Sequence, residues 1–415
     1  MGHYRTDFHK KDSKVLDRLN VYLFGVILVC YIANEYAVIS GVKIFYFFVP
    51  FWLFYNITIK KYKPNIFQSL ILISIIYSVI NMGLNGVLSS VDAVFIINNT
   101  LRYVVVLAIS YFLFEMERID GELLDKLFIF SGAALILLSI YIYMYDYDFK
   151  SRFSGPFDNP NDYSLLLCCV IYSALHKIRT NFTKPYLNGF LLLLIISAMV
   201  TILLTMSRSG IAVAALLVTS YMVMVFFELS KFKKLLFSVS FLLASVAVIN
   251  STSFENFIED TKLWDRITSD EANSSSEKRV LQINAGLNLL DQNPYIALFG
   301  VGISGTGDTE WFRHYYPKGY TDAVHVIHLT YMAVFVHHGI FGLLFFLTAF
   351  LIVLNKIYYS KSKNKIILYG QLGCLFIFSI FAYTVYYLPF WLYLVLLYIH
   401  STRKPKLIAN ALTAQ

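Results

Sequence analysis

Charged residues are scarce in this sequence: they make up 14% of its 415 residues, whereas an average soluble domain contains about 25%. Apolar residues account for 58%, and apolar runs long enough to cross a bilayer recur between residues 20 and 400. This balance excludes an ordinary soluble protein and indicates an all-α polytopic membrane protein. The net charge is +8. The excess Lys and Arg gather in connections between the apolar runs, as membrane topology requires, so the charge does not predict nucleic-acid binding.

Cysteine is also rare, and the sequence predicts no disulfide framework. Cys30, Cys168, Cys169 and Cys374 all lie inside apolar runs, where small buried residues are expected. The polar, basic segment 1–20 has no apolar run of its own, so we expect no cleavable signal peptide.

The apolar runs predict about 12 transmembrane helices at ~20 residues per span. Basic clusters such as Lys60, Lys61 and Lys63 fall in alternate connections, so the positive-inside rule places both termini in the cytoplasm. The spans are expected at residues 20–37, 42–59, 66–87, 93–114, 127–146, 161–177, 188–205, 209–228, 233–250, 325–354, 364–383 and 385–400.

One long connection interrupts the spans and lies on the outer side. Ser274 and Glu277 form a capping box, and an apolar stripe follows at helical spacing before Pro294, which predicts an amphipathic helix there. The stripe consists of Val280, Ile283, Leu287 and Leu290. The expected organisation is helices 1–9 in residues 1–250, the long loop in 251–324, helices 10–12 in 325–400 and a cytoplasmic tail in 401–415.

A polar outer loop precedes the sixth predicted span and contains Arg152, Asn159 and Asn161. Its Gly, Pro and Asn residues are typical of a tight turn that ends in a helix cap. The same residues could instead form a polar floor for a substrate at the membrane surface. The sequence leaves both interpretations open.

Two arginines lie on the same outer side, Arg208 in the break Ser207–Gly210 and Arg279 on the predicted loop helix. An arginine at membrane depth costs about 2.5–3.5 kcal/mol and usually has a partner. Arg208 either extends to lipid phosphates or binds a substrate phosphate through its bidentate fork. Arg279 is either a solvated surface charge or reaches inward from its helix.

Histidines gather at the outer end of the tenth predicted span, where His325 and His328 share a helical face shortly before Tyr331. They are either interfacial residues bonded to neighbours or groups that transfer a proton. No Cys or carboxylate stands at a matched spacing, so we expect no metal site and no cofactor. Arg102 lies within the fourth predicted span. It either has a functional role or is a buried, hydrogen-bonded structural residue, and the sequence leaves both open.

Together these segments resemble the O-antigen polymerase and O-antigen ligase family of bacterial inner-membrane proteins. Four pieces carry the resemblance in the family's order. They are the loop Gly155–Asn161, the turn Ser207–Gly210, the Arg279 helix leading to Pro294 and the turn Phe299–Gly302, and His328 with Tyr331, Gly339 and Gly342.

The resemblance implies a fold similar to the C superfamily of membrane glycosyltransferases and transfer of an undecaprenyl-pyrophosphate-linked oligosaccharide at the periplasmic face without a metal. It implies that Arg208 and Arg279 contact the pyrophosphate and that His328 serves the acceptor. The sequence departs from the family's pattern at Leu329, where Asn is usual, and at His337 and His338, where an acidic residue is usual.

We therefore expect a glycosyltransferase that acts as an O-antigen polymerase, with an O-antigen ligase as the alternative. A transporter or flippase fits less well, because ionisable residues within the spans are few and no inverted repeat is visible. The expected partners are the lipid-linked oligosaccharide, membrane lipids and, as a candidate, a chain-length regulator protein. The expected substrate contacts are Arg152, Asn159, Asn161, Ser207, His325, Tyr331 and Arg102.

Overall fold

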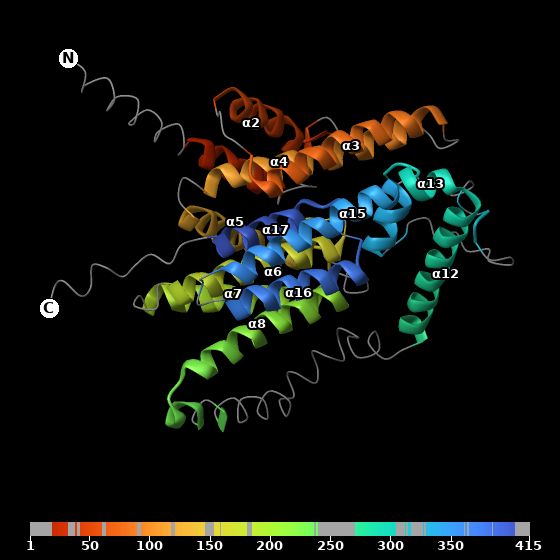
Figure 1. Ribbon diagram of the computed structural model, residues 1–415. Helices are drawn as coiled ribbons and strands as arrows, with labels where there is room; N and C mark the ends of the chain where they lie inside the picture. Colours follow the sequence, from red (N-terminus) through yellow and green to blue (C-terminus); the bar gives the residue numbers. More distant parts are fainter. Residues whose placement is uncertain are drawn as a thin grey trace, which may run out of the picture.

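The computed structural model is a bundle of helices with one short strand pair, and α12 lies across one end of this bundle (Figure 1). We call this the α12 end. The structure describes residues 19–31, 38–39, 42–59, 64–88, 93–117, 121–145, 153–157, 159–180, 185–235, 238–239, 270–303, 312, 314–316, 327, 329–360, 362, 365–383 and 385–402.

The described helices follow the predicted spans closely, except that the ninth, at 233–250, lies largely outside the described residues. Besides the helix Leu19–Tyr31, they are α2 (Phe45–Ile59), α3 (Ile66–Leu88), α4 (Ala93–Glu117), α5 (Gly121–Tyr145), α6 (Pro160–Thr180), α7 (Pro185–Leu204), α8 (Arg208–Glu228), α12 (Asp270–Gln292), α13 (Pro294–Phe299), α15 (Thr330–Tyr359), α16 (Lys365–Phe381) and α17 (Leu388–Thr402).

Six of the described helices are long and apolar enough to cross a membrane: α3, α4, α5, α7, α8 and α15. Four shorter apolar helices accompany them, within 19–31, α2, α16 and α17. The chain is therefore a polytopic membrane protein. The full count of about 12 spans stays a prediction.

Several predicted boundaries are wrong. α12 begins at Asp270, ahead of the capping box predicted at Ser274 and Glu277. The last span was expected from residue 385, but α17 begins at Leu388 after a turn.

Two more helix starts were misplaced. The second span was expected to begin at residue 42, but β1 (Val38–Ile39) and β2 (Val42–Lys43) form an antiparallel pair there and the helix begins at Phe45. The tenth span was expected from residue 325, but α15 begins at Thr330 after an extended Leu329. In both cases apolar residues also precede the first residue of the helix, so hydropathy alone could not mark the start of the helix.

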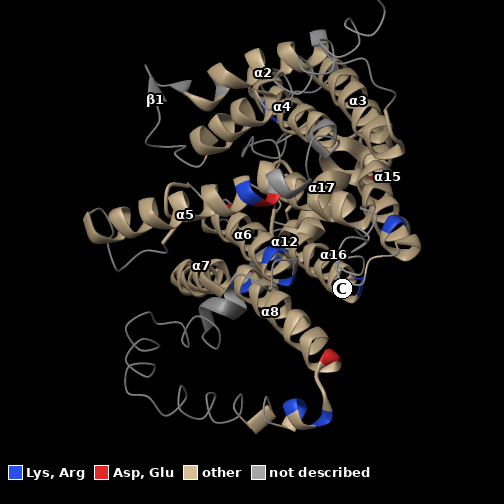
Figure 2. Ribbon diagram, turned by 90° about the vertical axis from the view of Figure 1, so that its left-hand side faces the viewer, with Lys and Arg blue, Asp and Glu red and all other residues tan. Residues whose placement is uncertain are grey.

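The centre of the bundle is formed by α6 and α17, which are buried on nearly all sides. α17 packs against α4, α6, α15 and α16, while α6 packs against α5, α7, α8 and α17. α17 is apolar along most of its length, as suits an enclosed helix, whereas α6 also buries polar side chains such as Asp162 and Ser164. The surrounding helices expose large apolar side chains, such as Phe51 and Leu137, and carry few charged residues (Figure 2). These surfaces suit contact with lipid.

α15 is broken at Gly339, where φ is 64°. A break leaves carbonyls of the preceding turn without helical donors, and the turn after α13 supplies replacements. The Val301 N–H donates to the Val336 carbonyl (2.9 Å) and the Gly302 N–H donates to the His337 carbonyl (3.0 Å). The loop that holds α12 is thereby joined to the interior of α15.

The close packing at this junction predicts that Gly300→Ala destabilises the protein. Gly300 has a φ of 78°, and a Cβ there would lie 2.3 Å from the backbone of His337. A strained φ and overpacking each cost about 1–3 kcal/mol, so we expect a loss of about 2–4 kcal/mol and a lower thermal midpoint in detergent. Gly189→Ala is the control, because nothing lies within 4 Å of its Cβ position. Equal midpoints for both variants would contradict the packing described.

Candidate functional site at the α12 end

The loop 153–157 and Asn159 form a tight turn and helix cap, one of the two interpretations that the sequence leaves open. The Asn159 carbonyl accepts the N–H groups of Asp162 and Tyr163, and its Oδ1 accepts the N–H of Asn161 (2.9 Å). Gly155 has a φ of 56° and lies so close to the Tyr163 ring that a Cβ would be 2.9 Å from it. The loop is thus held on top of α6, with Asn159 as part of its frame.

One side-chain hydrogen bond joins this loop to the turn before α8. The Ser207 hydroxyl donates to Asn161 Oδ1 (2.7 Å) and accepts from the Gly210 N–H (3.2 Å), which makes Ser207 the N-cap of α8. Ser207 is fully buried. The structure therefore brings together Asn161 and Ser207, two predicted site residues 46 positions apart, and fixes the start of α8 beside α6.

Arg208 follows directly as the first residue of α8, and its side chain is exposed. A helix N-terminus carries roughly half a positive charge, so a cation in the first turn is unfavourable by a few tenths of a kcal/mol or more. An anion at the same place is stabilised by the helix and by the guanidinium together.

Arg279 reaches the same region from α12. The buried face of α12 includes Gln282, Gly286 and Leu289, and a Cβ on Gly286 would lie 2.5 Å from the side chain of Met332 at the start of α15. Arg279 is half-buried near this face. The apolar stripe predicted from spacing is only partly buried, because Val280 and Leu287 are exposed instead.

The two guanidinium groups lie close enough to repel each other. Burial lowers the pKa of Arg279 from its usual value, and the positive charge of Arg208 lowers this pKa further. Among the described residues, no carboxylate forms an ion pair with either arginine. Two like charges held together in this way favour a bound anion between them.

A cluster of histidine and tyrosine side chains lies next to the Phe299–Gly302 turn, and the sequence analysis assigned it no role. Its members are Tyr77, His337, His338 and Tyr386. His337 Nδ1 is 3.1 Å from the Tyr386 hydroxyl, and the Tyr77 hydroxyl donates to the His338 carbonyl (2.5 Å). Neither ring nitrogen of His338 has a hydrogen-bond partner in the described part of the chain, although the residue is buried. Its signal in the sequence is two adjacent histidines inside an apolar run.

The remaining predicted residues are not all at this place. Tyr331 packs on α16, with its hydroxyl 2.9 Å from that of Ser379. Arg102 is exposed on α4, and no contact joins it to the other predicted residues that the structure describes. Arg152, His325 and His328 lie outside the described residues.

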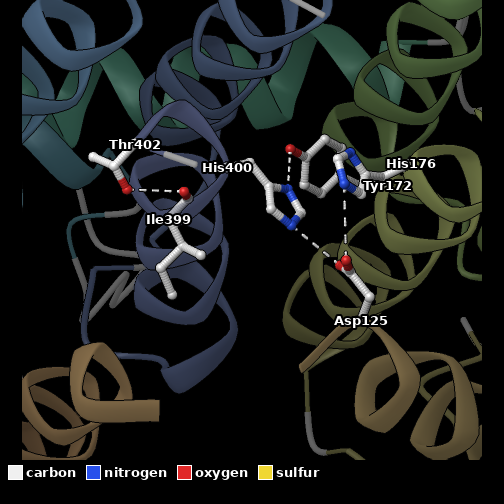
Figure 3. Close-up of polar contacts among 6 residues, drawn as sticks. All are labelled: Asp125, Tyr172, His176, Ile399, His400 and Thr402. Carbon is white, nitrogen blue, oxygen red and sulfur yellow. Dashed lines mark hydrogen bonds and ion pairs between the residues drawn. The ribbon is translucent and has the colours of Figure 1, made fainter. Parts of the chain in front are cut away.

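A group of residues that could hold a metal ion lies elsewhere in the described structure. Asp125, His176 and His400 converge where α5 begins and where α6 and α17 end, away from α12. Figure 3 shows the three side chains facing one another. The three residues lie far apart in the sequence, so no local spacing could have predicted them.

Comparison with known protein families identifies the region around the arginine pair. Residues 190–347 match the family described as O-Antigen ligase (Wzy_C). The chain contains an O-antigen ligase family domain. The resemblance recognised in the sequence is thus confirmed for this part of the chain. No curated protein matches the sequence significantly.

The O-antigen ligase family domain covers most of α7, all of α8, α12 and α13, and the first part of α15. It includes Arg208, Arg279 and the Phe299–Gly302 turn, whereas the loop 153–157 lies outside it. Members of the family transfer polyprenyl-linked glycans in surface polysaccharide synthesis.

Ser207→Ala tests the junction that positions Arg208. Replacing an N-cap serine by alanine costs about 0.5–2 kcal/mol, and here the Asn161 side chain also loses its donor. We expect a lower thermal midpoint in detergent. Ser220→Ala is the matched control, because that hydroxyl bonds only within its own helix, to the Leu217 carbonyl (2.9 Å). A midpoint for Ser207→Ala equal to that of the control would show that the junction contributes nothing.

Proposed function

We propose that the protein is an O-antigen polymerase, which joins undecaprenyl-pyrophosphate-linked repeat units of a surface polysaccharide. The observation that carries the proposal is the closeness of Arg208 and Arg279 at the α12 end, with no described carboxylate paired to either. A diphosphate fits this arrangement, because its negative charges can bind both guanidinium groups and the N-terminus of α8.

The diphosphate of the lipid-linked sugar is already a good leaving group. The proposed reaction therefore mainly requires stabilisation of the negative charge that develops on this diphosphate. The bond between the anomeric carbon and the diphosphate oxygen breaks, and its electron pair leaves with the diphosphate. Fixed positive groups in a site with little water are effective against this developing charge, and removal of one typically slows such reactions by about 10²–10³-fold. Two arginines provide this stabilisation, so the proposed transfer is independent of metal.

The acceptor hydroxyl forms the new bond to the anomeric carbon and loses its proton. In the proposal His328 orients this hydroxyl and takes the proton. His325, Tyr331, Arg152, Asn161 and Arg102 stay as proposed substrate contacts. Asn159 and Ser207 are proposed to act by holding the loop and Arg208 in place, since both are engaged in helix caps.

The proposal places the α12 end at the periplasmic face of the inner membrane and both termini in the cytoplasm. The distribution of Lys and Arg in the sequence supports this orientation. The grouping of the loop 153–157, the α8 start and α12 at one end agrees with it, because the sequence assigns all three to the outer side.

Arg208→Ala and Arg279→Ala should each lower chain growth by about 10²–10³-fold in an assay with the purified protein and an undecaprenyl-pyrophosphate-linked repeat unit. Arg208→Lys should also lose activity, because an ammonium group cannot form the bidentate contact. Lys231→Ala is the control, since it removes an exposed charge beyond the other end of α8. Initial rates should be the same with and without EDTA. Full activity of Arg208→Lys would contradict the bidentate contact.

The choice of polymerase over ligase rests on the loop Gly155–Asn161 and the turn Phe299–Gly302, and a deletion strain tests it. Loss of a polymerase leaves lipopolysaccharide capped with a single repeat unit, because ligation still occurs. Loss of a ligase leaves bare core and carrier-linked glycan. Gel analysis of lipopolysaccharide distinguishes these outcomes, and bare core with long glycan on the carrier would establish the ligase alternative.

A further inference from the structure

We propose that Asp125, His176 and His400 bind a divalent metal ion, with zinc as the best fit, at the end of the bundle opposite to α12. One ligand atom from each residue lies within 4.8 Å of the others. The three residues come from α5, α6 and α17 (Figure 3). A metal there would connect both central helices to α5.

The distances approach those of a zinc site. Zn–N bonds of about 2.0–2.1 Å place the ligand atoms of a tetrahedral site about 3.3 Å apart. His400 Nε2 lies 3.3 Å from Asp125 Oδ1, and His176 Nε2 lies 3.9 Å from Asp125 Oδ2. Two imidazoles with one carboxylate suit zinc, whereas magnesium and calcium prefer oxygen ligands.

The two imidazole rings bring both Nε2 atoms to one carboxylate. The rings of His176 and His400 are stacked, with centroids 4.0 Å apart and planes 10° from parallel. Their in-plane lone pairs therefore run side by side, and one ring has to turn about its Cβ–Cγ bond before both Nε2 atoms can bind the same ion. Two protonated rings at this separation would repel strongly, because Asp125 and His400 are almost fully buried. A divalent ion neutralises Asp125 while both rings stay neutral and donate their lone pairs.

A neighbouring hydroxyl holds one ligand in the required orientation. Tyr172 Oη lies 2.6 Å from His400 Nδ1, so with a metal on Nε2 the Nδ1–H donates to this hydroxyl. Such outer partners fix the tautomer and the ring orientation of metal-binding histidines. The side chain of His176 is 15% exposed, which leaves a route for the ion.

This site is separate from the proposed diphosphate site. His176 lies about 22 Å along α6 from Asn161, at about 1.5 Å per residue. The metal therefore has no part in the proposed transfer reaction and acts as a structural link between helices. Its test uses metal content and thermal stability, so the inference stands or fails independently of the proposed function.

The experiment uses the full-length protein in detergent, purified through a tag without histidines and freed of metal with a chelator. Added zinc should bind with one ion per chain and raise the thermal midpoint, because a ligand of the native state stabilises it. Cobalt in its place should give the visible absorption of a tetrahedral site. Asp125→Asn and His400→Gln should abolish both effects, and Tyr172→Phe should weaken zinc binding by about 10–100-fold.

His314→Gln is the matched control, since it removes an exposed histidine from the loop at the α12 end and should leave zinc binding unchanged. Absence of zinc binding and of the cobalt spectrum in the unaltered protein would overturn the proposal, whether or not the variants fold. Unchanged zinc binding in Asp125→Asn and His400→Gln would overturn the proposal too. So would a rise in thermal midpoint on adding zinc that is as large in these variants as in the unaltered protein.

Discussion

The proposed function depends on two positive charges that the fold holds close together. Burial and the nearby Arg208 both lower the pKa of Arg279, which means that its charged form is held against an electrostatic cost. The N-terminus of α8 adds to the same positive field. Their mutual repulsion would separate the two arginines unless other contacts held their helices in place. Those contacts are the Ser207 cap, its hydrogen bond to Asn161 and the packing of Gly286 against Met332.

Much of the fold follows from the sequence, because a membrane span needs about 20 apolar residues and leaves a long signal. The start of α8 was also visible, since Ser207 and Gly210 interrupt two apolar runs. Helix starts at residues 45 and 330 were not, because apolar residues continue into the non-helical segments before them. Nor could hydropathy show that α6 and α17 lie at the centre, since α17 resembles the lipid-facing helices in composition and α6 is less apolar than they are.

In the candidate site, too, some residues could be recognised from the sequence and others could not. Arg208 and Arg279 stood out because charges are rare in such a sequence, and the structure brings them near each other from separate elements. Val280 and Leu287 misled, because both are exposed and the buried face of α12 runs instead through Gln282, Gly286 and Leu289. The His337–Tyr386 contact and the group around Asp125 depend on neighbours from distant helices, which no local spacing reveals.

The junction between the Phe299–Gly302 turn and the break at Gly339 determines how α12 can move. Two backbone hydrogen bonds and a glycine contact fasten this turn to the middle of a 30-residue helix. α12 is therefore not a loosely tethered lid, because its displacement would have to pull on the interior of α15. In the proposed reaction, helices held in place in this way lose little conformational entropy when the diphosphate binds, so more of the binding energy remains for recognition of the rest of the substrate.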